Sequence, residues 1–268
     1  MPPPLERFMK LYQVDSFTAQ AFTGNPAGVW IGEHFPDATR MQQIAAEMNL
    51  SETAFVACGK EGYRIRYFTP TREVPLCGHA TLASAHILRE AGYLADGNRV
   101  ILHAPAAAVP VSVTGGWVTM RFPVYAISRI EEYAYLEAIL GATLKEAYKS
   151  DNGWIVARLI DETALVHARP HFPSMENDLI AATAEASAEG HDYSVRVFCH
   201  PSYGIEEDPV TGAAQCILAP YWSGQLGKTT FSSRQLSQRG GEMKTHLHPN
   251  GIDIVGRAVT VFAINVQV

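Results

Sequence analysis

The chain has 268 residues, 47% of them apolar and 18% charged, and acidic residues outnumber basic ones to give a net charge of −6. It contains no apolar run of about 18 residues, so the composition predicts a globular protein without a membrane-spanning helix. The basic residues form no stripe that could bind phosphates, which argues against nucleic acid and membrane partners. The first residues lack the apolar stretch of a secretory signal, and we therefore expect a cytoplasmic protein.

Hydrophobic periodicity predicts the secondary structure along the chain. Alternating residues and short apolar runs predict strands at residues 8–14, 27–31, 63–68, 99–103, 117–122, 154–159, 165–168, 193–199 and 254–268. Helical spacing predicts helices at residues 37–48, 80–91, 132–140, 175–188 and 213–222. Gly92 follows the second of these helices as a left-handed stop. Strands outnumber helices and do not alternate with them, which indicates an α+β fold rather than a regular βαβ sheet.

Two segments about 130 residues apart share one pattern. Each has a strand ending in an aromatic residue, a loop with Pro, a Glu, and a Gly that opens an Ala-rich helix. The first runs through residues 66–70, 73 and 78–83, and the second through residues 196–201, 207 and 212–217. This order indicates a duplicated, pseudo-twofold molecule, while chance similarity is the alternative.

Gly78 and Gly212 open the helices of the two segments. A helix start leaves about four backbone N–H groups without intrahelical acceptors and carries roughly half a positive charge. A glycine there lets a ligand approach the backbone, so two such starts could hold a carboxylate or an enolate. The alternative is that each glycine only allows a tight turn or close packing.

Three acid–base candidates lie near these glycines. Glu52 follows Ser51 in a polar break before an apolar segment, where desolvation would raise the pKa of its carboxyl. His79 comes directly after Gly78, and Asp208 precedes the second helix. Ser51 and Glu52 could equally be solvated loop residues, and Asp208 could cap the helix through its side chain.

Metal ligands are poorly represented in the pattern. The four cysteines show no C-x-x-C pairing, so we expect no metal site and free thiols in a reducing compartment. His246 and His248 alternate on a strand and could chelate only with further ligands that the sequence does not supply. Residues 238–241 are typical of a hairpin turn.

At these same residues the chain resembles the PhzF-like phenazine-biosynthesis family, which is related in fold to diaminopimelate epimerase. The matching stretches are FTGNP at 22–26, NLSETAF at 49–55, RYFTP at 66–70, CGHAT at 77–81 and EDPVTG at 207–212. They occur in the family's order and cover nearly the whole chain.

The resemblance implies two similar domains, each a β-barrel-like sheet around a central helix, with the active site between them. We expect residues 1–122, joined by the last strand at 259–268, to form one domain and residues 123–258 the other. The resemblance also implies a homodimer, no cofactor, and a small carboxylate-bearing substrate.

The family reaction moves a proton between ring carbons of a dihydro-hydroxyanthranilate. By resemblance, Glu52 carries the proton, while His79 and Asp208 position polar groups of the substrate and share protons with them. The resemblance assigns substrate binding to Ser51, Gly78, Thr211, Gly212 and Ala213.

Two departures from the family pattern bear on the reaction. Ala213 stands where the family often has Ser, so a hydroxyl that could contact substrate is missing. Related epimerases use two opposed cysteines, whereas this chain has Cys77 and, at the second position, Pro209. We therefore expect Cys77 not to be an essential base. An epimerase or racemase that uses Glu52 with another base remains an alternative, as does a non-catalytic binding protein on the same scaffold.

Overall fold

The computed structural model describes residues 8–60, 62–175, 179–200, 202 and 205–267. Residue contacts divide the chain into two compact units. Unit 1 takes the described residues up to Arg121 together with those from Val255 onward, and unit 2 comprises Phe122–Ile254. All four cysteines are thiols. No helix in the described part of the chain is long and apolar enough to cross a membrane.

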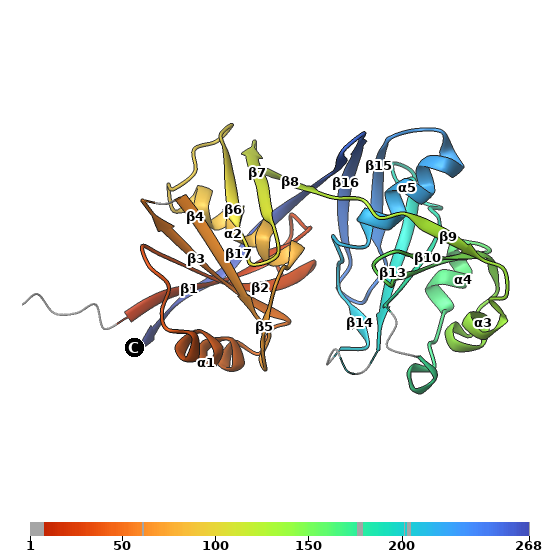
Figure 1. The fold of residues 1–268 in the computed structure, drawn as a ribbon, viewed down its shortest axis with the longest axis horizontal. Coiled ribbons are helices and arrows are strands. Elements are labelled where there is room, and N and C mark those ends of the chain that lie inside the picture. The colour runs from red at the N-terminus through yellow and green to blue at the C-terminus, as the bar shows by residue number, and fades with distance from the viewer. Residues whose placement is uncertain (1–7, 61, 176–178, 201, 203–204, 268) are drawn as a thin grey trace, which may run out of the picture. The chain divides into compact units, whose positions relative to one another are not determined.

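A closed barrel forms the frame of unit 1 (Figure 1). Its strands are β1 (Phe8–Ser16), β2 (Asn25–Gly32), β3 (Glu52–Gly59), β4 (Gly62–Phe68), β6 (Arg99–His103), β7 (Ala108–Thr114), β8 (Trp117–Phe122) and the second half of β17 (Gly251–Gln267). Each pairs with the next, and β17 closes the ring by pairing with both β8 and β1. The short β5 (Glu73–Val74) pairs with β4. Closure leaves this barrel without free strand edges.

Helix α2 (Gly78–Glu90) is the core of unit 1, since its residues from His79 to Leu88 are all buried. Its sequence suits burial on every side because small Ala residues let the barrel wall approach closely. The closeness is visible at Gly256 on β17, where a Cβ atom would lie 2.8 Å from the side chain of Leu82. Helix α1 (Ala38–Met48) buries only one stripe, and Asp37 caps its start by accepting from the Arg40 N–H at 3.0 Å.

Unit 2 has the same kind of architecture. Its strands are β9 (Ile127–Ile130), β10 (Leu144–Ser150), β11 (Ile155–Leu159), β12 (Leu179–Glu185), β13 (Tyr193–Cys199), β14 (Glu207–Asp208), β15 (Thr230–Gln235) and β16 (Gly241–His248). Its helices are α3 (Ala134–Leu140), α4 (Glu162–His167), the 3₁₀ turn η1 (Phe172–Ser174) and α5 (Gln215–Leu226). Helix α5 is mostly buried, and its Trp222 stacks on Tyr193 of β13 with ring centroids 5.2 Å apart.

The two units repeat one order of strand pairing. In unit 1, β2 pairs parallel with β3, β3 antiparallel with β4, and β4 parallel with β6. In unit 2, β11, β12, β13 and β15 follow the same sequence of parallel, antiparallel and parallel pairings. An ion pair recurs at matching places, between Arg66 and Glu73 at 2.6 Å and between Arg196 and Glu207 at 2.8 Å. These correspondences support a duplication.

Two predicted elements are wrong. Residues 165–168, predicted as a strand, belong largely to α4, because Asp161 caps a helix there by accepting from the Ala164 N–H at 2.7 Å. Residues 175–188, predicted as a helix, contain strand β12, and residues 176–178 lie outside the described part. The Ala-rich β12 is buried on both faces: Ala182 packs in the cluster with α3 and α4, and Thr183 accepts a hydrogen bond from Trp222 of α5. Tertiary burial overrides the helical preference of alanine.

Candidate active site

The end of α1 determines where Glu52 lies. Asn49 adopts a left-handed conformation, with φ of 48°, and its N–H bonds the Ala45 carbonyl, so the helix ends there. After Leu50 and Ser51 the chain enters β3, and Glu52 is the first residue of that strand, in parallel register with Ala27 of β2. The carboxyl group therefore lies at one end of the barrel wall.

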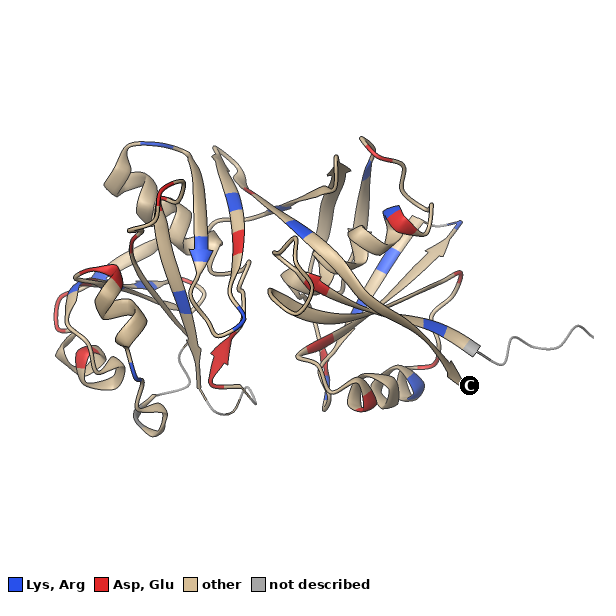
Figure 2. Cartoon of the chain, turned by 180° about the vertical axis from the view of Figure 1, so that it is seen from behind, with Lys and Arg blue, Asp and Glu red and all other residues tan. Residues whose placement is uncertain are grey.

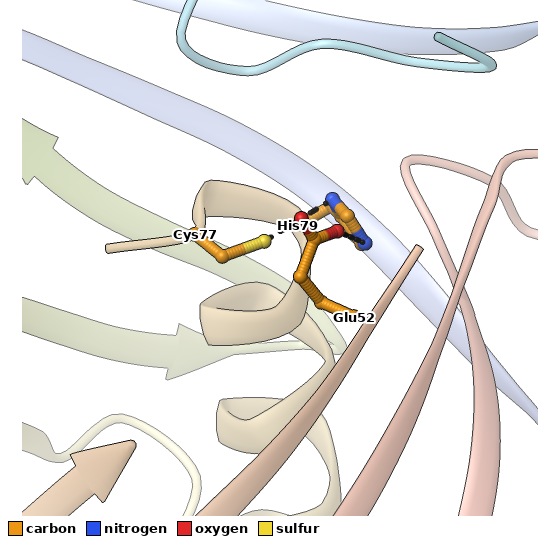
Figure 3. Close-up of side chains that lie close together, drawn as sticks. All are labelled: Glu52, Cys77 and His79. Carbon is orange, nitrogen blue, oxygen red and sulfur yellow. Dashed lines mark hydrogen bonds and ion pairs between the residues drawn. The ribbon is translucent and has the colours of Figure 1, made fainter. Parts of the chain in front are cut away.

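His79 is brought to the same place by the start of α2. Its Nε2 atom lies 3.4 Å from Glu52 Oε2 and 3.3 Å from Ser51 Oγ, while its Nδ1 atom lies 3.4 Å from Cys77 Sγ. Figure 3 shows Glu52, Cys77 and His79 pointing toward one another from the start of β3 and the start of α2. The His79 backbone is also held, because its carbonyl accepts from the Ser16 hydroxyl at 2.8 Å. Unit 1 thus assembles Ser51, Glu52, Cys77 and His79 in one cluster.

Burial shapes the acidity of Glu52. Only 20% of its side chain is exposed, against 8% for His79. Desolvation raises the pKa of Glu52, and hydrogen bonds from the Ser51 and Cys77 side chains oppose this with smaller effects. A carboxyl with a raised pKa is a stronger base when ionised and exchanges protons more readily near neutral pH.

The ring nitrogens of His79 can exchange their donor and acceptor roles when the protonation state of Glu52 changes. When Glu52 is ionised, an Nε2–H group can donate to its carboxylate, and the single hydrogen of the Cys77 thiol can be donated either to that carboxylate or to Nδ1. When Glu52 is protonated, its O–H can donate to a bare Nε2, and Nδ1–H can face the sulfur. The imidazole therefore stabilises either protonation state of Glu52 without moving.

The start of α2 presents accessible backbone. The first bond of the helix runs from the Thr81 N–H to the Cys77 carbonyl at 3.1 Å, so the N–H groups of residues 78–80 have no acceptor within the helix. A Cβ atom added to Gly78 would meet no other atom within 4 Å. Packing therefore does not require glycine here, and the reading of Gly78 as a point of ligand approach is favoured.

A second cluster lies in unit 2, where Asp208 ends β14. Asp208 Oδ2 accepts from the Thr211 hydroxyl at 2.6 Å. Gln235 of β15 joins this loop to the sheet: its Oε1 accepts from the Thr211 N–H at 2.9 Å, and its Nε2 donates to the Asp208 carbonyl at 2.7 Å. Ala214 is the residue that precedes the first turn of α5, so Asp208 does not occupy the capping position of this helix.

Gly212 and Ala213 lie in the turn that leads into α5. The carbonyls of these residues accept from the N–H groups of Gln215 and Cys216 at 3.0 and 3.1 Å. Helix α5 begins at Gln215, two residues later than predicted. Gln235 was not anticipated from the sequence. Its only signal is its place at the end of the strand after the central helix, and a single glutamine there is not distinctive.

The predicted site residues therefore fall into two clusters. Ser51, Glu52, Gly78 and His79 lie together in unit 1, and Asp208, Thr211, Gly212 and Ala213 follow one another in unit 2. That the two clusters act on one substrate stays a prediction.

The unit 1 cluster also has three atoms suited to metal binding. One ligand atom each from Glu52, Cys77 and His79 lies within 4.8 Å of the others. The spacing of the cysteines does not reveal this arrangement, because Glu52 is far from Cys77 and His79 in the sequence. An ion bound here would compete with the hydrogen bonds that now join the three side chains.

Comparisons with known proteins agree across sequence and structure. A family model described as phenazine biosynthesis-like protein, PhzC-PhzF, matches residues 14–263. A relative in Halalkalibacterium halodurans, named an uncharacterized isomerase, is 40% identical over 94% of this chain and 96% of that protein. A crystal structure of a PhzF-family protein from Enterococcus faecalis has a TM-score of 0.91 and 33% identity, covering 97% of this chain and 100% of the other. A predicted epimerase of Pseudomonas aeruginosa shares the fold, with a TM-score of 0.78 and 17% identity over 97% of this chain and 99% of the other.

Proposed function

We propose a reaction for this chain, which belongs to the phenazine biosynthesis-like PhzC-PhzF family and is an isomerase. It moves a proton between two carbons of a small carboxylate-bearing molecule, with Glu52 as the general acid and base. The family resemblance and the epimerase-like α+β fold expected from the sequence are confirmed. The observation that carries the proposal is the contact of a desolvated Glu52 carboxyl with His79, beside the open start of α2.

The substrate carboxylate binds the N–H groups at the start of α2. These N–H groups lie at the positive end of the helix dipole, and Gly78 leaves space for an anion to reach them. Developing negative charge near these groups is stabilised by donors that are already oriented. Electrostatic stabilisation of this kind is typically worth a few kcal/mol of barrier for each donor.

Glu52 performs both proton transfers. Its carboxylate takes a proton from a substrate carbon: the C–H bond breaks, an O–H bond forms on Glu52, and the electron pair spreads into the substrate's conjugated system. The carboxyl then returns the proton to a second carbon, and the double bonds end in new positions. His79 holds the Glu52 carboxyl through Nε2 in both states, 3.4 Å from Oε2.

Asp208 and Thr211 act on the same substrate in this proposal, through polar groups away from the reacting carbons. A dihydro-hydroxyanthranilate-type compound is the first substrate to test. Ala213 cannot offer the hydroxyl that the family often has at this position, so related carboxylates belong in the same assay. The reaction as proposed uses no cofactor, and the protein works as a homodimer in the cytoplasm.

One observation favours a second function. The Cys77 thiol lies 3.4 Å from His79 Nδ1, in the cluster that contains Glu52. A thiol next to an imidazole can be deprotonated and can serve as a base. An epimerase or racemase of amino acids needs two bases on opposite faces of the substrate carbon, so Glu52 and Cys77, whose ligand atoms lie within 4.8 Å of each other, would have to separate to act as that pair.

Deuterium exchange separates these functions. The protein is incubated in D₂O with each candidate carboxylate, and NMR locates deuterium in the recovered compounds. An isomerase places deuterium at the carbon that receives the proton and shifts the double bonds. A racemase exchanges the α-proton and abolishes optical rotation. Deuterium incorporation that persists unchanged in Glu52→Gln would contradict the assignment of Glu52.

A further inference from the structure

A cluster of metal-ligating side chains lies on the outer face of β16, apart from the residues assigned above. Along this strand Met243 and Thr245 are buried, so the alternate residues point outward. His246 and His248 are two of these outward residues and therefore project from the same face. Their rings lie against each other, with centroids 4.2 Å apart.

The hairpin from β16 to β17 brings a carboxylate to these rings. The chain turns after His248, and β17 begins at Gly251, whose φ of 141° suits glycine. The side chain of Asp253 on β17 then reaches His248, with its Oδ2 2.8 Å from Nε2. One ligand atom from each of His246, His248 and Asp253 lies within 4.8 Å of the others. The third ligand that the sequence does not reveal is thus supplied by the neighbouring strand.

We propose that His246, His248 and Asp253 form a binding site for a divalent transition-metal ion such as Zn²⁺. Two imidazoles and one carboxylate are a common set of three protein ligands for zinc, with the remaining position left to water or another ligand. Bonds of about 2.0–2.2 Å at tetrahedral angles place donor atoms roughly 3.3–3.5 Å apart. To reach this geometry, the distance between His248 Nε2 and Asp253 Oδ2 increases slightly from 2.8 Å, and the His246 side chain rotates toward these two atoms.

The surroundings permit this adjustment. His246 is exposed and both His248 and Asp253 are partly exposed, so small side-chain rotations disturb no core packing. The backbone of β16 is held in place by its pairing with β15, which sets Thr230 opposite His246. The bound ion would connect two strands across their hairpin and stabilise it, because it binds the folded arrangement only.

Zinc titration tests the site. The full-length protein competes for Zn²⁺ with a chromogenic chelator, and thermal melting is followed with and without Zn²⁺. We expect the wild type to bind one ion that Asp253→Asn and His246→Ala bind at least tenfold more weakly. Zn²⁺ should raise the melting temperature of the wild type but not of these two variants. His34→Ala is the matched control, because His34 is an exposed histidine beside a single carboxylate, 3.9 Å from Glu33. It should bind as the wild type does.

Co²⁺ substitution distinguishes this site from the Glu52, Cys77 and His79 cluster. A cobalt ion on two imidazoles and a carboxylate shows ligand-field bands without thiolate charge-transfer absorption. The proposal is overturned if the wild type takes up no ion, if Asp253→Asn and the wild type bind Zn²⁺ equally, or if the single bound Co²⁺ has thiolate absorption. Melting of the variants without metal verifies that they are folded.

Discussion

Replacing Glu52 with Gln should abolish turnover while the fold and ligand binding stay nearly intact. The amide keeps the shape of the carboxyl and can still contact His79 Nε2, which now lies 3.4 Å from Oε2. It can neither accept nor return a proton at ordinary pH. General acid–base catalysis contributes about 10²–10⁴-fold, or roughly 2.7–5.4 kcal/mol of barrier, and more when one group performs both transfers. The rate of deuterium incorporation measures the loss, and binding of an unreactive analogue should change little.

The same substitution gives a stability result whose sign follows from the pKa. Burial raises the pKa of Glu52 in the folded protein above its unfolded value. The folded state therefore holds the proton more tightly, and this contribution to stability is fully present below the unfolded pKa and is lost as pH rises through the folded pKa. Glutamine has no such dependence. Wild type should thus lose melting temperature relative to Glu52→Gln as pH rises from about 4 to 7.

Two outcomes would refute this reasoning. If Glu52→Gln kept most of its activity on a verified substrate, the proton would move by another route. If the variant were several degrees less stable than wild type at neutral pH while the two were equal in acid, the ionised carboxylate would be stabilising the fold. The pKa of Glu52 would then be lowered and not raised. Melting curves at several pH values, recorded for both proteins in the same buffers, decide the second point.

Three further substitutions test the other parts of the proposal. Cys77→Ala should leave turnover within about tenfold, or roughly 1.4 kcal/mol of barrier, and complete loss with an intact fold would favour the two-base racemase. Gly78→Ala should leave the melting temperature unchanged or slightly higher, because the added Cβ enters open space. The same Cβ stands where the substrate carboxylate is proposed to approach, so KM for a carboxylate substrate should rise. An unchanged KM would argue against anion binding there. Gln235→Ala removes the buried amide that holds Thr211 and the Asp208 carbonyl, so it should lower the free energy of unfolding by about 1–3 kcal/mol and raise KM. Urea unfolding measures the stability and initial rates measure KM. A variant as stable and active as wild type would show that this amide is dispensable.

Local patterns predicted much of the fold because burial repeats along each element. The strand at residues 99–103 and the strand at residues 193–199 have the bounds that alternation and apolar content indicate. The stop at Gly92 is observed, with φ of 82°. The recurring Gly-opened helix and the strand before it also indicated a duplication, since each copy carries its own pattern. These features depend on neighbours within a few residues, and sequence proximity is enough to reveal them.

The failures and the site geometry depend on contacts that the sequence does not encode locally. The alanines of β12 prefer a helix in isolation, but the strand lies between β11 and β13 with both faces buried, so its neighbours decide its conformation. Glu52 and His79 were each identifiable from their motifs, yet only barrel closure around α2 places Oε2 and Nε2 3.4 Å apart. Gln235 and Asp253 carry no recognisable signal, because Gln235 acquires its partner from the turn before α5 and Asp253 acquires its partner from the preceding strand. The sequence by itself therefore determined the residue types and local turns of the site, and tertiary packing alone decided which of them meet.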